Sequence, residues 1–332
     1  MYKRQDYYFG NDLENATTNT LHLTSDYTDF DTLFQFDPKP PVKVKIKDEF
    51  ADVKSHAESF NIYELPFPDL AMDLDIKRIL YHRIDLKNIS GKFRTTKNHY
   101  IHIDTLELNS VGGDFKLSGY FNGSDPKHIY FKPNLSIQNA DIYRLAYKFE
   151  NFGQDQVLSE NLHGKLTSTI TGNVRLYPDM VPDLDQSEIR MNVKILDGKL
   201  ENYEPMSMFS DYIGDKNLKK IRFDTLQNKI DIDKGKIVIP NMTIESTLGH
   251  IEFSGTHDSK HNIEYYLRIP WKTAKKAALY KIFGNKKKVD SISGEEDIIK
   301  ADKTKRTRYL NLKIIGNMED YDISLGKKKK AK

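Results

Sequence analysis

The feature that most constrains the fold of this chain is an alternation of apolar and polar residues with a period of two. Ile189, Met191, Val193 and Ile195 are separated by polar residues. Similar runs occupy residues 42–46, 101–103, 106–108, 237–239, 251–253, 263–269 and 310–314. Because successive side chains of a strand point to opposite faces, each run predicts a strand with one apolar and one wet face. Turn residues such as Asp197-Gly198 separate the runs. We therefore predict a mainly β fold, a long antiparallel meander.

Helical segments are few. Residues 48–60, 142–152, 206–213 and 272–283 have helix-compatible spacing and no internal proline. Residues 284–308 are mostly charged and show no periodicity, which predicts a mobile loop. The chain ends in a basic tail, residues 327–332.

The sequence also contains an internal repeat. The segment from Ile101 to Gly119 can be aligned with the segment from Ile237 to Gly255 at a constant offset. The aligned segments share apolar positions, a serine and two glycines. Because chance similarity between alternating strands seldom matches glycines in register, the alignment predicts an elongated sheet that grows by repetition.

Composition and motifs exclude several classes of protein. The 332 residues carry a net charge of +3, with no overall basic field of the kind that nucleic-acid-binding proteins carry. The absence of cysteine excludes thiolate metal sites and cysteine nucleophiles. No phosphate loop, zinc-protease or serine-hydrolase motif is found, so we predict no catalytic residue, no cofactor and no metal. His257 and His261 flank a turn and could approach each other, but a solvated turn is the simpler interpretation.

Most of the chain, from about residue 70 to 325, resembles the carboxy-terminal region of the AsmA family. The resemblance is strongest from Leu196 to Pro270. It begins with an acidic-Gly turn at Asp197-Gly198 and continues with the run Gly235-Lys236-Ile237-Val238-Ile239-Pro240-Asn241-Met242. It then passes through Ser246 and the strand ending Ser254-Gly255-Thr256-His257. Upstream, the stretch Gly112-Gly113-Asp114-Phe115-Lys116-Leu117-Ser118-Gly119 is similar to the preceding strands of that family.

The resemblance implies a non-enzymatic protein of the Gram-negative envelope, periplasmic and anchored to the inner membrane through a segment upstream. It implies roles in phospholipid movement and outer-membrane biogenesis, with lipids and envelope proteins as partners. It also implies a twisted antiparallel sheet that forms an apolar groove, similar to bridge-like lipid-transfer proteins. The side chains expected to line this groove are Ile101, Ile103, Leu106, Leu108, Phe115, Leu117, Ile237, Ile239, Met242, Ile244, Ile251 and Phe253.

Two questions stay open at this point. The alternating apolar residues could instead form a closed core between two sheets, which would make the protein a structural or regulatory scaffold without a lipid path. The segment following Trp271, with Lys272, Lys275 and Lys276, could lie on an anionic membrane surface or could close the end of the sheet. A carbohydrate-processing enzyme would need two carboxylates paired in a cleft, and no such pair can be recognised in the sequence.

The predicted organisation has four parts. Residues 1–5 match the translation of a sequencing-library transposon end, so we interpret them as a non-native scar. Residues 6–69 form an upstream β segment with a short helix, and residues 70–326 form the AsmA-like β region with its loop at 284–308. The basic tail follows.

Overall fold

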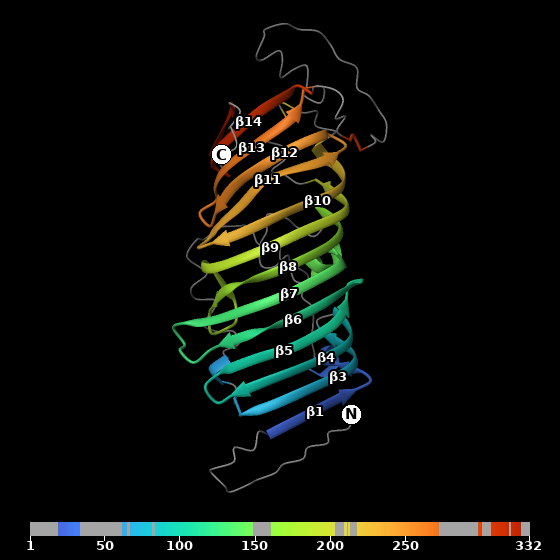
Figure 1. The fold of residues 1–332 in the computed structure, drawn as a ribbon, viewed down its shortest axis with the longest axis vertical. Coiled ribbons are helices and arrows are strands. Elements are labelled where there is room, and N and C mark those ends of the chain that lie inside the picture. The colour runs from blue at the N-terminus through green and yellow to red at the C-terminus, as the bar shows by residue number, and fades with distance from the viewer. Residues whose placement is uncertain are drawn as a thin grey trace. The chain divides into compact units, whose positions relative to one another are not determined.

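The protein is mainly β, as predicted. The structure is a computed structural model that describes residues 19–33, 62–64, 67–81, 84–148, 161–202, 209–210, 212, 218–271, 298–300, 307–318 and 320–326. About three quarters of these residues lie in strands, which form one open sheet that is not closed into a barrel (Figure 1). The described helices are few and short.

The strands contain the alternating runs of residues 101–103, 106–108, 189–195, 237–239, 251–253, 263–269 and 310–314, and other strands lie outside these runs. They are β1 (Asn19–Ser25), β2 (Thr28–Asp29), β3 (Leu70–Tyr81), β4 (Ile84–Thr96), β5 (Tyr100–Ser110), β6 (Gly113–Asn122), β7 (Ile129–Asp141), β8 (Leu162–Leu176), β9 (Pro182–Glu201), β10 (Lys220–Asp233), β11 (Lys236–Ser246), β12 (Gly249–Asp258), β13 (Asn262–Pro270), β14 (Tyr309–Asn317) and β15 (Asp320–Leu325). The described helical segments are α1 (Phe30–Leu33), the 3-10 helix η1 (Ile62–Glu64) and α3 (Ile142–Lys148).

The order of strands in the sheet follows the chain from β3 to β15, and β1 lies next to β3. Neighbouring strands from β3 to β7 and from β11 to β15 pair antiparallel, whereas β1 and β2 both run parallel to β3. The antiparallel prediction therefore holds for the strands from β3 to β7 and from β11 to β15, whereas β1 and β2 differ from it and make the sheet mixed. The physical reason is that about forty residues separate β2 from β3, which is enough chain for the crossover that parallel strands need.

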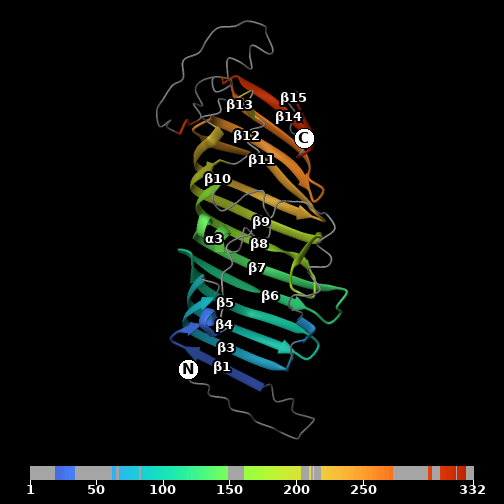
Figure 2. The same ribbon diagram turned by 180° about the vertical axis from the view of Figure 1, so that it is seen from behind.

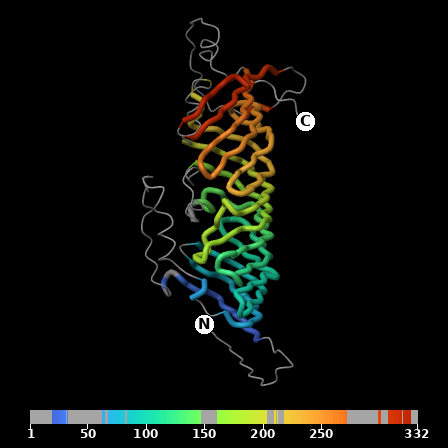
Figure 3. Tube along the Cα trace, turned by 90° about the vertical axis from the view of Figure 1, so that its left-hand side faces the viewer, coloured from blue at the N-terminus to red at the C-terminus, as the bar shows by residue number. Residues whose placement is uncertain are grey.

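Two compact units divide the described strands. Unit 1 comprises residues 1–140, 168–191 and 232–234, and unit 2 comprises residues 141–167, 192–231 and 235–332. Figure 2 shows the strands of each unit from behind, and Figure 3 lets the hairpins of each unit be followed along the Cα trace.

The internal repeat is confirmed by strand pairing. In unit 1, Ile103 pairs with Gly119, and the register shifts by one residue before Leu106 pairs with Leu117. In unit 2, Ile239 pairs with Gly255, and the same shift precedes the pairing of Met242 with Phe253. Hairpins β5–β6 and β11–β12 thus share strand lengths, register and a β-bulge at the same place. A bulge bends and twists a hairpin locally, so both copies bend at the same position.

Unit 2 contains a filled core at its carboxy-terminal strands. The side chains of Ile269 and Ile314 are completely buried, and Leu312 is 1% exposed. Phe209 and Leu218, which precede β10, pack in the same cluster. Here the apolar side of the sheet is covered by residues outside the strands, which is the closed arrangement that the alternation allowed.

Several predicted segments lie partly or wholly outside the described residues. These are the proposed scar, the strand at 42–46, the helices at 48–60 and 272–283, and the basic tail. The predicted helix at 142–152 is present as α3 over its described part. Of the predicted loop at 284–308, residues 298–300 and 307–308 are described, and the Ile299 amide donates to the Ser246 carbonyl at 3.1 Å.

Candidate functional site: an apolar sheet face

The predicted groove residues of unit 1 lie on one face of hairpin β5–β6. Paired residues of neighbouring strands point to the same side of a sheet. Leu106 pairs with Leu117 and Leu108 with Phe115, and the bulge keeps Ile103 on the same side as Leu106. The structure therefore brings together Ile101, Ile103, Leu106, Leu108, Phe115 and Leu117 as the sequence predicts.

This apolar face continues onto the neighbouring strands. One cross-strand row joins Leu74, Gly91, Leu106, Leu117 and Leu135 on strands β3 to β7. The parallel strand β1 extends the row with Leu23, which pairs with Leu74. We call this side of β1 and β3–β7 the apolar face of unit 1. It is wider than the hairpin on which the sequence analysis placed the site.

Glycine keeps the row compact at one position. The Cβ that an alanine would add at Gly91 would lie 2.6 Å from the ring of Phe93 and 3.3 Å from Leu106. The Phe93 ring thus lies beside the glycine and fills the place of its missing side chain. Phe93 pairs with Ile103, so the ring belongs to the same apolar face.

The large side chains of this face are only partly buried. All six predicted groove residues of β5 and β6 retain solvent exposure, in contrast to the filled core of unit 2. The described strands all belong to one sheet, so within the described residues no second sheet covers them. Partly exposed aliphatic and aromatic side chains in a contiguous row are a surface that can bury acyl chains, at about 0.8 kcal/mol per methylene.

One end of the apolar face is closed. Phe121 and Ile129 are 2% and 0% exposed, and Ile62 of η1 packs against them. Ile101, Phe131, Tyr63 and Phe67 contribute to the same cluster. Ile101 was predicted to line the groove, but the covering residues were not predicted, because they lie outside any periodic run.

The predicted groove residues of unit 2 are divided between open and closed surroundings. Ile237, Ile239 and Met242 are partly buried, whereas Ile244 packs against the buried cluster of Ile142, Ile195 and Phe223. Ile251 is 7% exposed and Phe253 packs against the filled core, with its ring 5.3 Å from that of Tyr265. The structure places these six side chains on one side of hairpin β11–β12, but the β12 residues contact core side chains.

The opposite face of unit 1 is polar and charged. Arg94 and Asp104 form an ion pair at 2.8 Å, and Lys116 and Glu107 form another at 2.9 Å. These pairs are exposed and contribute little to stability. They make the sheet amphipathic, because one side binds water and the other presents hydrocarbon.

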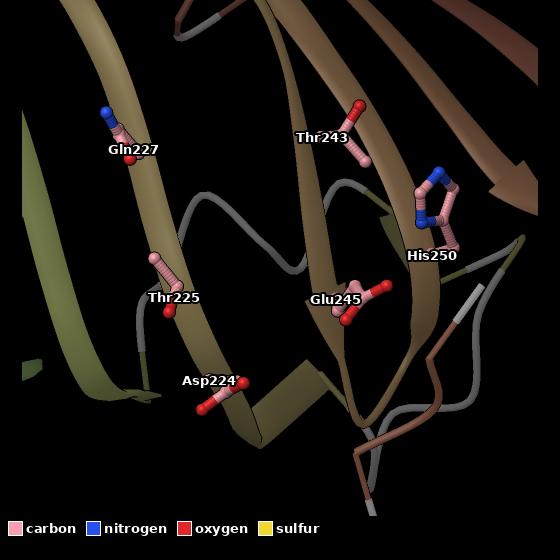
Figure 4. Close-up of a pocket in the computed structure, with 6 residues that line it drawn as sticks. All are labelled: Asp224, Thr225, Gln227, Thr243, Glu245 and His250. Carbon is pink, nitrogen blue, oxygen red and sulfur yellow. The ribbon is translucent and has the colours of Figure 1, made fainter.

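Unit 2 has a polar hollow of ≈ 350 Å³ that the sequence analysis did not identify. Its lining residues come from three neighbouring strands and are Asp224, Thr225, Gln227, Thr243, Glu245 and His250 (Figure 4). Glu245 and His250 pair across β11 and β12, and Asp224 lies 3.8 Å from the ammonium of Lys300. No sequence motif marks these positions.

The histidines that the sequence analysis discussed do not assemble a metal site. The rings of His257 and His261 lie 6.0 Å apart, and burial together with the nearby His261 lowers the pKa of His257. Among the residues that the structure describes, no group of three or more His, Asp or Glu side chains could hold a metal ion. His257 instead contacts the Tyr265 hydroxyl at 3.3 Å.

Trp271 packs against the filled core of unit 2, and its amide donates to the Arg308 carbonyl at 2.8 Å. Lys272, Lys275 and Lys276 lie outside the described residues.

No helix in the described part of the chain is long and apolar enough to cross a membrane. No protein-family model, curated protein or solved structure matches the chain.

Proposed function

We propose that the chain is a non-enzymatic cell-envelope protein that binds or conducts lipids along the apolar face of its β-sheet. The observation that carries the proposal is the row of partly exposed Leu, Ile and Phe side chains on β3–β7. Its sequence resemblance to the AsmA family supports a role in phospholipid transport and outer-membrane biogenesis. The same resemblance supports a periplasmic location with an inner-membrane anchor.

The chemistry that this function requires is simple. An acyl chain laid along the row would cover Ile103, Leu106 and Phe115 and would release water from both partners. No proton or electron has to move, so no residue is proposed as catalytic and no cofactor is needed. Neighbouring strands repeat the row, so a lipid could pass from one strand to the next without meeting a charged side chain.

A second function is supported by the filled core of unit 2. Ile269, Leu312 and Ile314 are buried as in an ordinary globular domain. A protein whose whole apolar face were covered in this way would be a structural or regulatory scaffold in envelope assembly. The two functions differ in whether phospholipid accompanies the protein.

The test is native mass spectrometry with lipid extraction on the full chain purified from an envelope fraction. The parent protein is expected to carry phospholipid, and Ile103→Asp is expected to lose it because an unpaired charge would meet the acyl chain. Ser118→Asp, on the polar face of β6, is the matched control and should retain the lipid. Lipid-free parent protein would support the scaffold and contradict the lipid proposal.

A further inference from the structure

The polar hollow of unit 2 lies on the opposite side of the sheet from the predicted groove residues. Ile244 pairs with Ile251 and packs, like it, in an apolar cluster, whereas the adjacent residues Glu245 and His250 pair with each other. Because successive residues of a strand point to opposite faces, Glu245 and His250 lie on the wet side of hairpin β11–β12. A ligand in the hollow is therefore separated by the sheet from any acyl chain on the apolar side.

The hollow has the size of a small-molecule site and a polar lining. Its volume of ≈ 350 Å³ lies at the lower end of the range of ligand pockets, about 300–1,000 Å³. Strand β10 contributes one side of the lining and strands β11 and β12 the other, as Figure 4 shows. The six lining residues are Asp224, Thr225, Gln227, Thr243, Glu245 and His250. None of the six is apolar, so the hollow fits a polar ligand.

His250 carries the observation that points to a ligand. Its Nδ1 is buried and has no hydrogen-bond partner among the described residues. A buried polar atom without a partner costs free energy, and a ligand in the hollow could supply the missing hydrogen bond. Nδ1 donates in one neutral tautomer of the ring and accepts in the other, and a hydroxyl group can pair with it in both cases.

The other lining groups also favour hydroxyls over charged ligands. The carboxylates of Asp224 and Glu245 only accept hydrogen bonds, whereas the Gln227 amide and the Thr243 hydroxyl both donate and accept. An anion such as phosphate would be repelled by the two carboxylates. An amine would use the acceptors and leave the donors of the lining without a partner. A ligand with several hydroxyls uses both kinds of group.

We propose that the hollow binds one pyranose ring of a saccharide through hydrogen bonds to its hydroxyls. Neighbouring hydroxyls of the ring donate to Asp224 and Glu245 and accept from Gln227, and one of them pairs with Nδ1 of His250. The site binds the sugar without reaction. The proposal does not depend on the lipid function, because the hollow and the apolar side chains lie on opposite sides of the sheet.

Saturation-transfer difference NMR on the full chain tests the class of ligand. The probes are the methyl β-glycosides of glucose, galactose and N-acetylglucosamine, with ethylamine and methyl phosphate as charged comparisons. At least one glycoside should receive saturation from the protein, with a Kd of about 1 mM, as befits so small a ligand. Ethylamine and methyl phosphate should receive none.

Two variants locate the binding in the hollow. Thr243→Val and Gln227→Leu each remove one hydrogen-bonding group at a strand position that tolerates an apolar residue, so each should bind the glycoside about fivefold more weakly. Thr256→Val is the matched control, because it makes the same substitution on β12 at a residue that does not line the hollow. Its affinity should equal that of the parent.

His250→Leu separates a binding role from a structural one. The substitution removes Nδ1 together with its desolvation cost, so thermal unfolding should occur at the same or a higher temperature while glycoside binding weakens.

The proposal is overturned if no glycoside receives saturation from the parent, or if ethylamine or methyl phosphate does so in their place. Glycoside affinity that is unchanged in Thr243→Val, Gln227→Leu and His250→Leu would overturn it as well. None of these results bears on lipid binding, which is measured separately.

Discussion

Gly119 of β6 lies directly opposite Ile103 of β5, and the register of the hairpin shifts immediately afterwards. A Cβ on Gly119 would lie 2.5 Å from the carbonyl oxygen of Lys132 on β7, and its φ of +156° is one that other residues rarely adopt. Gly255 is opposite Ile239 in the second copy, where a Cβ would lie 2.5 Å from the Glu264 carbonyl. Both copies of the repeat therefore have a glycine where the backbone of the next strand lies too close for a side chain.

Gly119→Ala should destabilise unit 1 by about 2–4 kcal/mol, because backbone atoms of β7 would have to move. Urea unfolding measures the change. Ser118→Ala, the adjacent residue on the polar face, should change stability by less than about 0.5 kcal/mol. If the two variants unfold at the same urea concentration, the close approach does not matter for stability.

Truncation of two leucines should distinguish the filled core from the apolar face. Leu312→Ala leaves a cavity at a site that is 1% exposed and should cost about 2–5 kcal/mol. Leu106→Ala, at a partly exposed site, should cost about 1 kcal/mol or less because water can fill the space. Thermal unfolding of the two variants compares them. Equal losses of stability in the two variants would show that the face of unit 1 is as closed as the core of unit 2.

Stability should fall on acidification through His257. Burial and the charge of His261 lower its pKa in the folded protein, whereas the unfolded chain has the ordinary value of about 6.5. The unfolded state then binds more protons below that value, so stability is complete above about pH 6.5 and decreases as the pH falls through the lowered folded pKa. Asp258, beside it, opposes the shift, and the Tyr265 hydroxyl contacts the ring.

His257→Gln should remove this contribution. The difference in unfolding free energy between the parent and the variant should therefore change between pH 7 and pH 5. A difference that stays constant over that range would show that His257 does not couple protons to folding.

The sequence predicted several strands because each of these carries its own signal, whereas Asp197-Gly198, predicted as a turn, lies within β9. The alternation at 263–269 became β13, and the change of phase between Ile103 and Leu106 corresponds to the observed bulge. Such a signal is local, since one apolar side chain every second residue is enough to define the face of a strand.

The covering residues could not be predicted in the same way. Ile62 and Phe209 reach their clusters through non-periodic segments, and their burial depends on contacts distant in sequence. The parallel pairing of β1 with β3 is equally non-local, because a single strand carries no mark of its neighbour. The alternation therefore identified the apolar face, whereas the part of it that is covered became known only from the structure.

The central claim is that lipid contacts one named face of the sheet, and photo-crosslinking tests it most directly. A benzoylphenylalanine residue would replace Phe115 on the apolar face or Tyr120 on the polar face of the same strand, β6. After illumination of envelope fractions, covalently attached lipid would be identified by mass spectrometry. Crosslinks to phospholipid from position 115 and none from position 120 are the predicted result. Equal labelling at both positions, or no lipid at position 115, would contradict the account.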